Sequence, residues 1–148
     1  DPAHLERLLR GRYAFVNVWR NVSDAPVERH PLALCDAASV SKEDLVTFEI
    51  RYADRVGENY LACHASSHAW WYFPRATRDE AILIKCWDSR GRDFLGLLEE
   101  GRGHPSPPAA AAVPATFSLH TAFEDDATVQ DAPQRESIEV RTVAFFAE

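Results

Sequence analysis

Short stretches in which apolar and polar residues alternate recur along most of this 148-residue chain. In residues 46–52, apolar side chains from Val46 to Tyr52 occupy every second position and are expected to face inward, as in a half-solvated antiparallel strand. Further strands are predicted at residues 13–20, 32–35, 59–64, 68–73, 81–87, 117–123 and 135–146. A short helix is predicted between Asp1 and Gly11, with little helix elsewhere. The pattern indicates a mostly β jelly roll or barrel rather than an α/β sheet.

Composition limits the partners that such a chain can have. The formal net charge of −7 argues against nucleic acid, because phosphates would be repelled, and no apolar run approaches the length of a membrane span. Cys35, Cys63 and Cys86 are odd in number and widely spaced, which predicts reduced thiols rather than disulfides or a zinc site. We therefore expect a single cytoplasmic domain whose partner is a small molecule.

His120 is the strongest candidate for a metal ligand. In the predicted strand at residues 117–123 it shares a face with Ser118 and Ala122, whose small side chains leave room beside the imidazole. A histidine on a strand is by itself more often structural. Its assignment as a ligand therefore depends on the residues that follow it.

Arg135 and Ser137 lie two positions apart on the next predicted strand, so their side chains point the same way. A guanidinium and a hydroxyl placed like this suit one carboxylate, through a bidentate ion pair and a further hydrogen bond. Arg141 has the same parity and is the second candidate for this role. The alternative for Arg141 is a surface ion pair with Glu139 or Asp125.

Four further residues are candidates for a substrate pocket: Asn17, Trp19, Tyr60 and Tyr72. Asn17 interrupts an apolar strand face, and a buried amide needs hydrogen-bond partners, either in a ligand or in neighbouring backbone. For Trp19 the burial preference of aromatic side chains favours the core over a substrate contact. Tyr72 follows Trp70 and Trp71 directly, and three consecutive residues cannot all face one side of a strand.

Several segments of the chain carry a family resemblance. They are NVWR (17–20), PLALCD (31–36), DRVGENY (54–60), HAWWYF (68–73), HTAFED (120–125) and DAPQRESIEVR (131–141). In this order they resemble the hydroxylase/desaturase family of secondary metabolism, which includes gibberellin-desaturase-like and aspergillic-acid-hydroxylase-like proteins and is related to the cephamycin-methoxylation components. That family is assigned to the iron(II)/2-oxoglutarate-dependent oxygenases. The resemblance covers nearly the whole chain, and HTAF with RESIEVR is its most specific part.

The resemblance implies a double-stranded β-helix (a cupin-like jelly roll) that hydroxylates or desaturates a small organic metabolite. His120 would be one ligand of an iron(II) held by two histidines and a carboxylate. Arg135 and Ser137 would hold 2-oxoglutarate, with Arg141 as the fallback anchor.

The chain departs from the family pattern in two places. A Pro/Ala-rich loop at residues 101–115 looks inserted, and the His-x-Asp pair that the family carries upstream of NVWR is absent. We expect residues 1–148 to be the C-terminal part of a single jelly-roll oxygenase domain and to be inactive alone. The alternative is a non-catalytic jelly-roll binding module that has lost its iron site.

Overall fold

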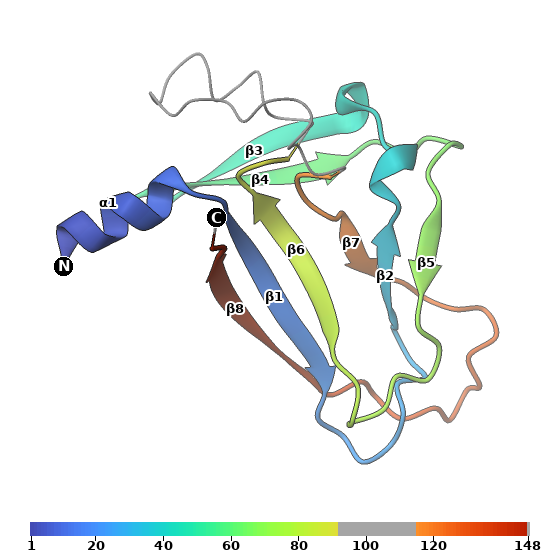
Figure 1. Ribbon diagram of the computed structural model, residues 1–148. Coiled ribbons are helices and arrows are strands. Elements are labelled where there is room, and N and C mark those ends of the chain that lie inside the picture. Colours follow the sequence, from blue (N-terminus) through green and yellow to red (C-terminus); the bar gives the residue numbers. More distant parts are fainter. Residues whose placement is uncertain (92–114, 148) are drawn as a thin grey trace.

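The computed structural model describes residues 1–91 and 115–147 (Figure 1). Helix α1 (Pro2–Arg10) comes first, and two 3-10 turns follow later, at Ala37–Ser39 and Lys42–Asp44. The strands are β1 (Tyr13–Asn21), β2 (Leu32–Cys35), β3 (Leu45–Arg51), β4 (Val56–Ala62), β5 (Trp70–Tyr72), β6 (Ile82–Asp88), β7 (His120–Ala122) and β8 (Ser137–Phe145). The predicted loop at 101–115 lies outside the described residues except for its last position. Within the described part, no helix has the length and apolar character that crossing a bilayer requires.

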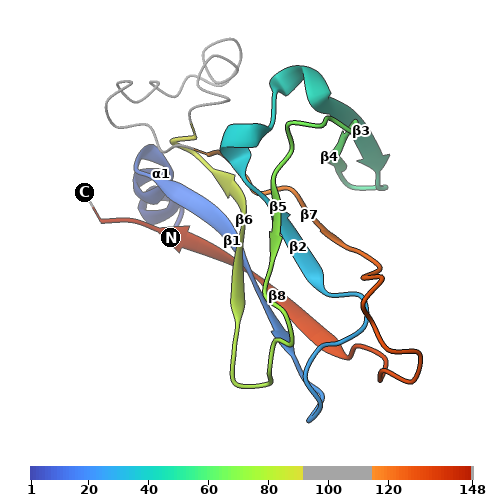
Figure 2. The same cartoon turned by 90° about the vertical axis from the view of Figure 1, so that its right-hand side faces the viewer.

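Two antiparallel sheets form the body of the molecule. One has the strand order β6-β1-β8 and the other the order β5-β2-β7, and the two lie side by side in Figure 2. The mostly β architecture predicted from the alternation is confirmed. Among the described strands, β8 and β7 are each the outer strand of a sheet, which leaves one edge of each without a partner.

The hydrophobic core lies between these two sheets. It contains Trp19, Val27, Leu32, Ala76, Ile82 and Ile84. Trp19 is only 4% exposed. Of its two interpretations from sequence, core residue or substrate contact, it is therefore a core residue. Burial of large apolar side chains between two layers is the main favourable term in a fold of this kind.

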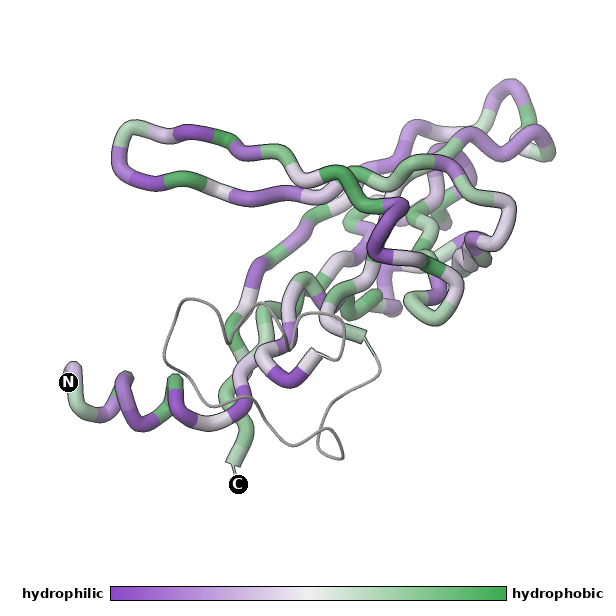
Figure 3. Tube along the Cα trace, turned by 90° about the horizontal axis from the view of Figure 1, so that it is seen from above, coloured by the Kyte–Doolittle hydropathy of each residue, from purple (hydrophilic) through white to green (hydrophobic). Residues whose placement is uncertain are grey.

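Strands β3 and β4 form a separate two-stranded hairpin. Viewed from above, it extends away from the two sheets, with hydrophobic and hydrophilic residues mixed along it (Figure 3). The expectation that the apolar residues of 46–52 face inward is wrong, because Val46, Phe48, Ile50 and Tyr52 are between 38% and 48% exposed. A two-stranded ribbon has no second layer of its own, and the described residues supply none.

An ion pair ties the start of β1 to the end of β6. Asp88 is 1% exposed and accepts from Arg12 Nε at 3.2 Å and Arg12 Nη2 at 2.8 Å. Lys85 Nζ lies 3.7 Å from the same carboxylate. Burial raises the pKa of Asp88, but the hydrogen bonds from Arg12 and from the Arg90 amide, together with the two positive charges, outweigh it and leave that pKa below its ordinary value.

We predict that this ion pair stabilises the fold at pH values above the ordinary pKa of an aspartate. The stabilisation should be lost as the pH falls through the lowered pKa of Asp88. Because the folded-state pKa of Asp88 is depressed, the unfolded chain takes up the proton first as the pH falls. Asp88→Asn should lower the free energy of unfolding at neutral pH by about 3 kcal/mol, since it leaves Arg12 without its counter-charge. Urea unfolding measured between neutral and acidic pH tests both expectations.

The matched control is Asp54→Asn, which removes an exposed carboxylate paired with Arg55 and should change stability little. If Asp88→Asn were to lose stability in acid as steeply as the unmodified protein, the assignment of that loss to Asp88 would be wrong.

Candidate functional site

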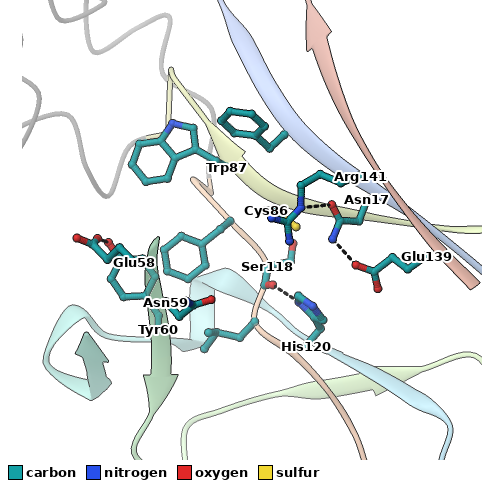
Figure 4. Close-up of a pocket in the computed structure, with 13 residues that line it drawn as sticks. Asn17, Glu58, Asn59, Tyr60, Cys86, Trp87, Ser118, His120, Glu139 and Arg141 are labelled. Carbon is teal, nitrogen blue, oxygen red and sulfur yellow. Dashed lines mark hydrogen bonds between the residues drawn. The ribbon is translucent and has the colours of Figure 1, made fainter. Parts of the chain in front are cut away.

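A cavity of about 500 Å³ opens where the two sheets meet the β3–β4 hairpin. Side chains from β1, β6 and β8 form one wall, β7 and the segment before it form another, and β4 contributes a third (Figure 4). Residues far apart in the sequence therefore share one space. The polar groups in it are the ones with the chemistry to bind a ligand.

His120 faces this cavity from the first position of β7, where it is paired with Leu34 of β2. Its Nδ1 lies 2.9 Å from the carbonyl oxygen of Ser118. Because a carbonyl only accepts hydrogen bonds, Nδ1 must carry a proton. In the neutral ring the lone pair is then on Nε2, the arrangement that metal-binding histidines usually adopt.

The donor set for a metal is incomplete in the part of the chain that the structure describes. Residues 1–91 and 115–147 contain no group of three or more His, Cys, Asp or Glu side chains that could hold an ion. His68 is bonded to Asp44 through Nε2 at 3.0 Å, away from the cavity. Burial raises the pKa of the Cys86 thiol in the cavity wall, which disfavours the thiolate that a metal would need. His120 thus fits as one ligand of a facial triad, and the described residues do not complete that triad.

Arg141, Asn17 and Glu139 form the polar wall opposite His120 (Figure 4). Asn17 is 2% exposed and lies directly across from Arg141 in the β1–β8 ladder. Its Oδ1 accepts from Arg141 Nε at 3.3 Å, and its Nδ2 donates to Glu139 Oε1. Arg141 therefore presents a guanidinium to the same space that His120 enters.

Arg135 and Ser137 do not line this cavity. Arg135 precedes β8 and donates from Nη1 to the carbonyl oxygen of His30 at 2.8 Å. Its guanidinium carbon lies 5.9 Å from the centroid of the Trp19 ring. Ser137 begins β8 opposite Asn21. The structure thus brings His120 together with Arg141 and not with the Arg135–Ser137 pair, whose assigned role stays a prediction.

Of the four pocket candidates, Asn17 and Tyr60 line the cavity. The Tyr60 ring stacks on Phe117 with centroids 5.2 Å apart and planes 8° apart. Burial raises the pKa of the Tyr60 hydroxyl, and so does its hydrogen bond to Glu58, so it stays protonated. Tyr72 lies outside the cavity, with its hydroxyl donating to Asp125 at 3.2 Å, and Trp19 belongs to the core.

Sequence reasoning did not assign cavity positions to Glu139, Cys86 and Phe117. Glu139 lies two positions before Arg141, so the two side chains are expected on the same face of the strand. Its place in the cavity wall could therefore have been predicted from that of Arg141. Phe117 lies three positions before His120 and was placed on the opposite face of a longer strand. The described strand begins only at His120, which frees the preceding residues from strict alternation.

Comparisons with known proteins agree with this architecture. A family model described as oxidoreductase/YMDC permease-like domain matches residues 1–145. Aspirochlorine biosynthesis protein N of Aspergillus oryzae is 34% identical over 148 residues, which cover 98% of this chain and 53% of that protein. Hydroxylase/desaturase asaB of Aspergillus flavus is 33% identical over 154 residues, covering 95% and 59% of the respective chains. The chain therefore spans about half the length of these curated relatives.

A solved structure of a related protein has a similar fold. The iron and alpha-ketoglutarate-dependent endoperoxidase NvfI superposes with a TM-score of 0.73 at 26% identity, covering 97% of this chain and 46% of that one. The fold is the jelly roll of the iron(II)/2-oxoglutarate oxygenases. The chain belongs to the oxidoreductase/YMDC permease-like family, and its relatives are named hydroxylase/desaturases and iron(II)/2-oxoglutarate-dependent dioxygenases, which confirms the resemblance seen in its motifs.

Proposed function

We propose that this chain forms the C-terminal part of an oxygenase domain that uses iron(II) and 2-oxoglutarate to hydroxylate or desaturate a small organic metabolite. The observation that carries the proposal is the shared cavity of His120 and Arg141. One side chain offers an imidazole lone pair to a metal, and the other offers a guanidinium to a carboxylate. When bound, iron(II) with 2-oxoglutarate supplies the oxidising power, and the protein holds and orients the reactants.

In this proposal Arg141 anchors the distal carboxylate of 2-oxoglutarate. Its Nε is held by Asn17, which leaves the terminal nitrogens to make charge-assisted bonds to a carboxylate. Arg135, the first candidate from sequence, is engaged elsewhere. Its bond to the His30 carbonyl holds a residue with a positive φ of 52°, which supports a structural role for Arg135.

The two remaining iron ligands would come from polypeptide outside the described residues. The open edge of β7 is next to His120, so a strand that paired there could carry a His-x-Asp to the metal. A strand pairing with the open edge of β8 would extend the other sheet in the same way. The relatives, whose length is about twice the matched region, have the chain needed for this.

The substrate would lie against the apolar side of the cavity, where Tyr60 stacks on Phe117. The net charge of −7 supports a small molecule rather than nucleic acid as the partner. Cys35, Cys63 and Cys86 are unpaired, which supports a reducing compartment, and we propose the cytoplasm.

The first test of this function is iron binding by the protein in its full natural length. Anaerobic addition of iron(II) and then 2-oxoglutarate should produce a metal-to-ligand charge-transfer band in the visible spectrum. His120→Ala should abolish the band because it removes a ligand of the facial triad. His64→Ala, which removes an exposed histidine away from the cavity, should leave it intact.

A protein that binds neither iron nor 2-oxoglutarate would contradict the proposal and favour the non-catalytic binding module. Loss of the band in both histidine variants would contradict the role of His120. Residues 1–148 alone should show no 2-oxoglutarate turnover, since the described part holds no group of three side chains that could complete the iron site.

The second test separates the two candidate anchors. Arg141→Gln should raise the 2-oxoglutarate concentration for half-saturation about ten- to a hundredfold, the worth of charge-assisted hydrogen bonds. Arg135→Gln should leave this concentration nearly unchanged and lower the unfolding midpoint, because it loses the bond to His30. Titration of the charge-transfer band measures both variants, and the reverse ranking would restore Arg135 as the anchor.

A further inference from the structure

Asn17 occupies an unusual position for an amide. It lies in the middle of β1, the central strand of its sheet, and is 2% exposed. Its neighbours across the ladders are Ile84 on β6 and Arg141 on β8. A buried amide at such a place is costly unless its hydrogen bonds are made, so its partners indicate what it does.

Those partners fix the orientation of the amide. The Arg141 guanidinium can only donate, and it donates from Nε to Asn17 Oδ1 at 3.3 Å. An ionised Glu139 can only accept, and it accepts from Asn17 Nδ2. Asn17 therefore bridges a positive and a negative side chain, with Arg141 and Glu139 on either side of it in Figure 4.

The same Glu-x-Arg spacing occurs elsewhere in the molecule with no amide between the two side chains. On β3, Arg51 reaches its neighbour Glu49 directly, with Nη2 2.9 Å from the carboxylate. On β8, Glu139 and Arg141 have the same spacing and both face the cavity, yet within the described residues no ion pair joins them. On β8 the side chain of Asn17 lies between the two charges and bonds both of them.

We propose that Asn17 is a positioning residue that holds Arg141 away from Glu139 and so keeps its terminal nitrogens open to the ligand carboxylate. The inference rests on the proposed role of Arg141 as the 2-oxoglutarate anchor. Without the amide, the guanidinium closes on Glu139 as Arg51 does on Glu49. The ligand then has to break an ion pair before it binds.

The test is a double-mutant cycle in the full natural length of the protein, with anaerobic binding of 2-oxoglutarate to the iron(II) form as the readout. Asn17→Ala should weaken binding about tenfold, the size of a charge-assisted hydrogen bond. Adding Glu139→Gln in the same chain should recover most of this loss, because the competing carboxylate is gone. A purely structural role for Asn17 would not be rescued by a change at Glu139.

Two further variants guard against misfolding. Asn17→Asp keeps the size of the side chain but places a carboxylate against Arg141, so it should weaken binding and resist rescue by Glu139→Gln. Asn21→Ala removes another buried amide of β1, one that bonds the backbone carbonyls of Ala25 and Ala76. It should lower the unfolding midpoint and leave 2-oxoglutarate binding unchanged.

The inference is overturned if Asn17→Ala binds 2-oxoglutarate normally, or if Glu139→Gln fails to restore the loss, while Arg141→Gln still weakens binding. The proposed function then stands without it. If Arg141→Gln has no effect on binding, the assignment of Arg141 as the anchor is wrong and this inference fails with it, while the proposed oxygenase function is still judged by iron binding and the His120→Ala variant.

Discussion

The pairing of β1 with β8 is the constraint on which the rest of the site depends. Its register runs without interruption from Tyr13 opposite Phe145 to Asn21 opposite Ser137. This ladder places Asn17 beside Arg141, a residue 124 positions away in the sequence. Strand β1 also pairs with β6 and so positions Cys86 in the same cavity wall. A shift of one residue would turn Arg141 to the opposite face of the sheet.

The sequence predicts where the strands lie better than it predicts which of their faces are buried. Strand alternation has a period of two, so the strands are visible without tertiary information. Which face is buried depends on whether a second layer covers it. Residues 46–52 look like a half-buried strand, but in the described residues they belong to a hairpin with no layer against it. Periodicity cannot distinguish these two situations.

The same limit applies to the site. His120, Asn17 and Tyr60 were candidates from the sequence, and all three line the cavity. The parity of 135, 137, 139 and 141 placed both arginines on one face but could not rank them. Which arginine lines the cavity depends on where the ladder ends: pairing with β1 stops at Ser137, so Arg135 lies beyond the strand and turns to His30. The end of a ladder is a tertiary property that one sequence does not contain.

If Arg141 anchors a carboxylate as proposed, there is a physical reason for the acidic Glu139 to lie nearby. A guanidinium that a bound ligand will cover loses hydration, and an isolated buried charge is costly. Glu139 compensates this charge, but a direct ion pair would occupy the nitrogens that the ligand needs. With the Asn17 amide between them, Glu139 stays close enough to offset the charge of Arg141. The terminal nitrogens of Arg141 remain accessible to a ligand. On this proposal the polar wall is organised for an incoming carboxylate before any ligand is present.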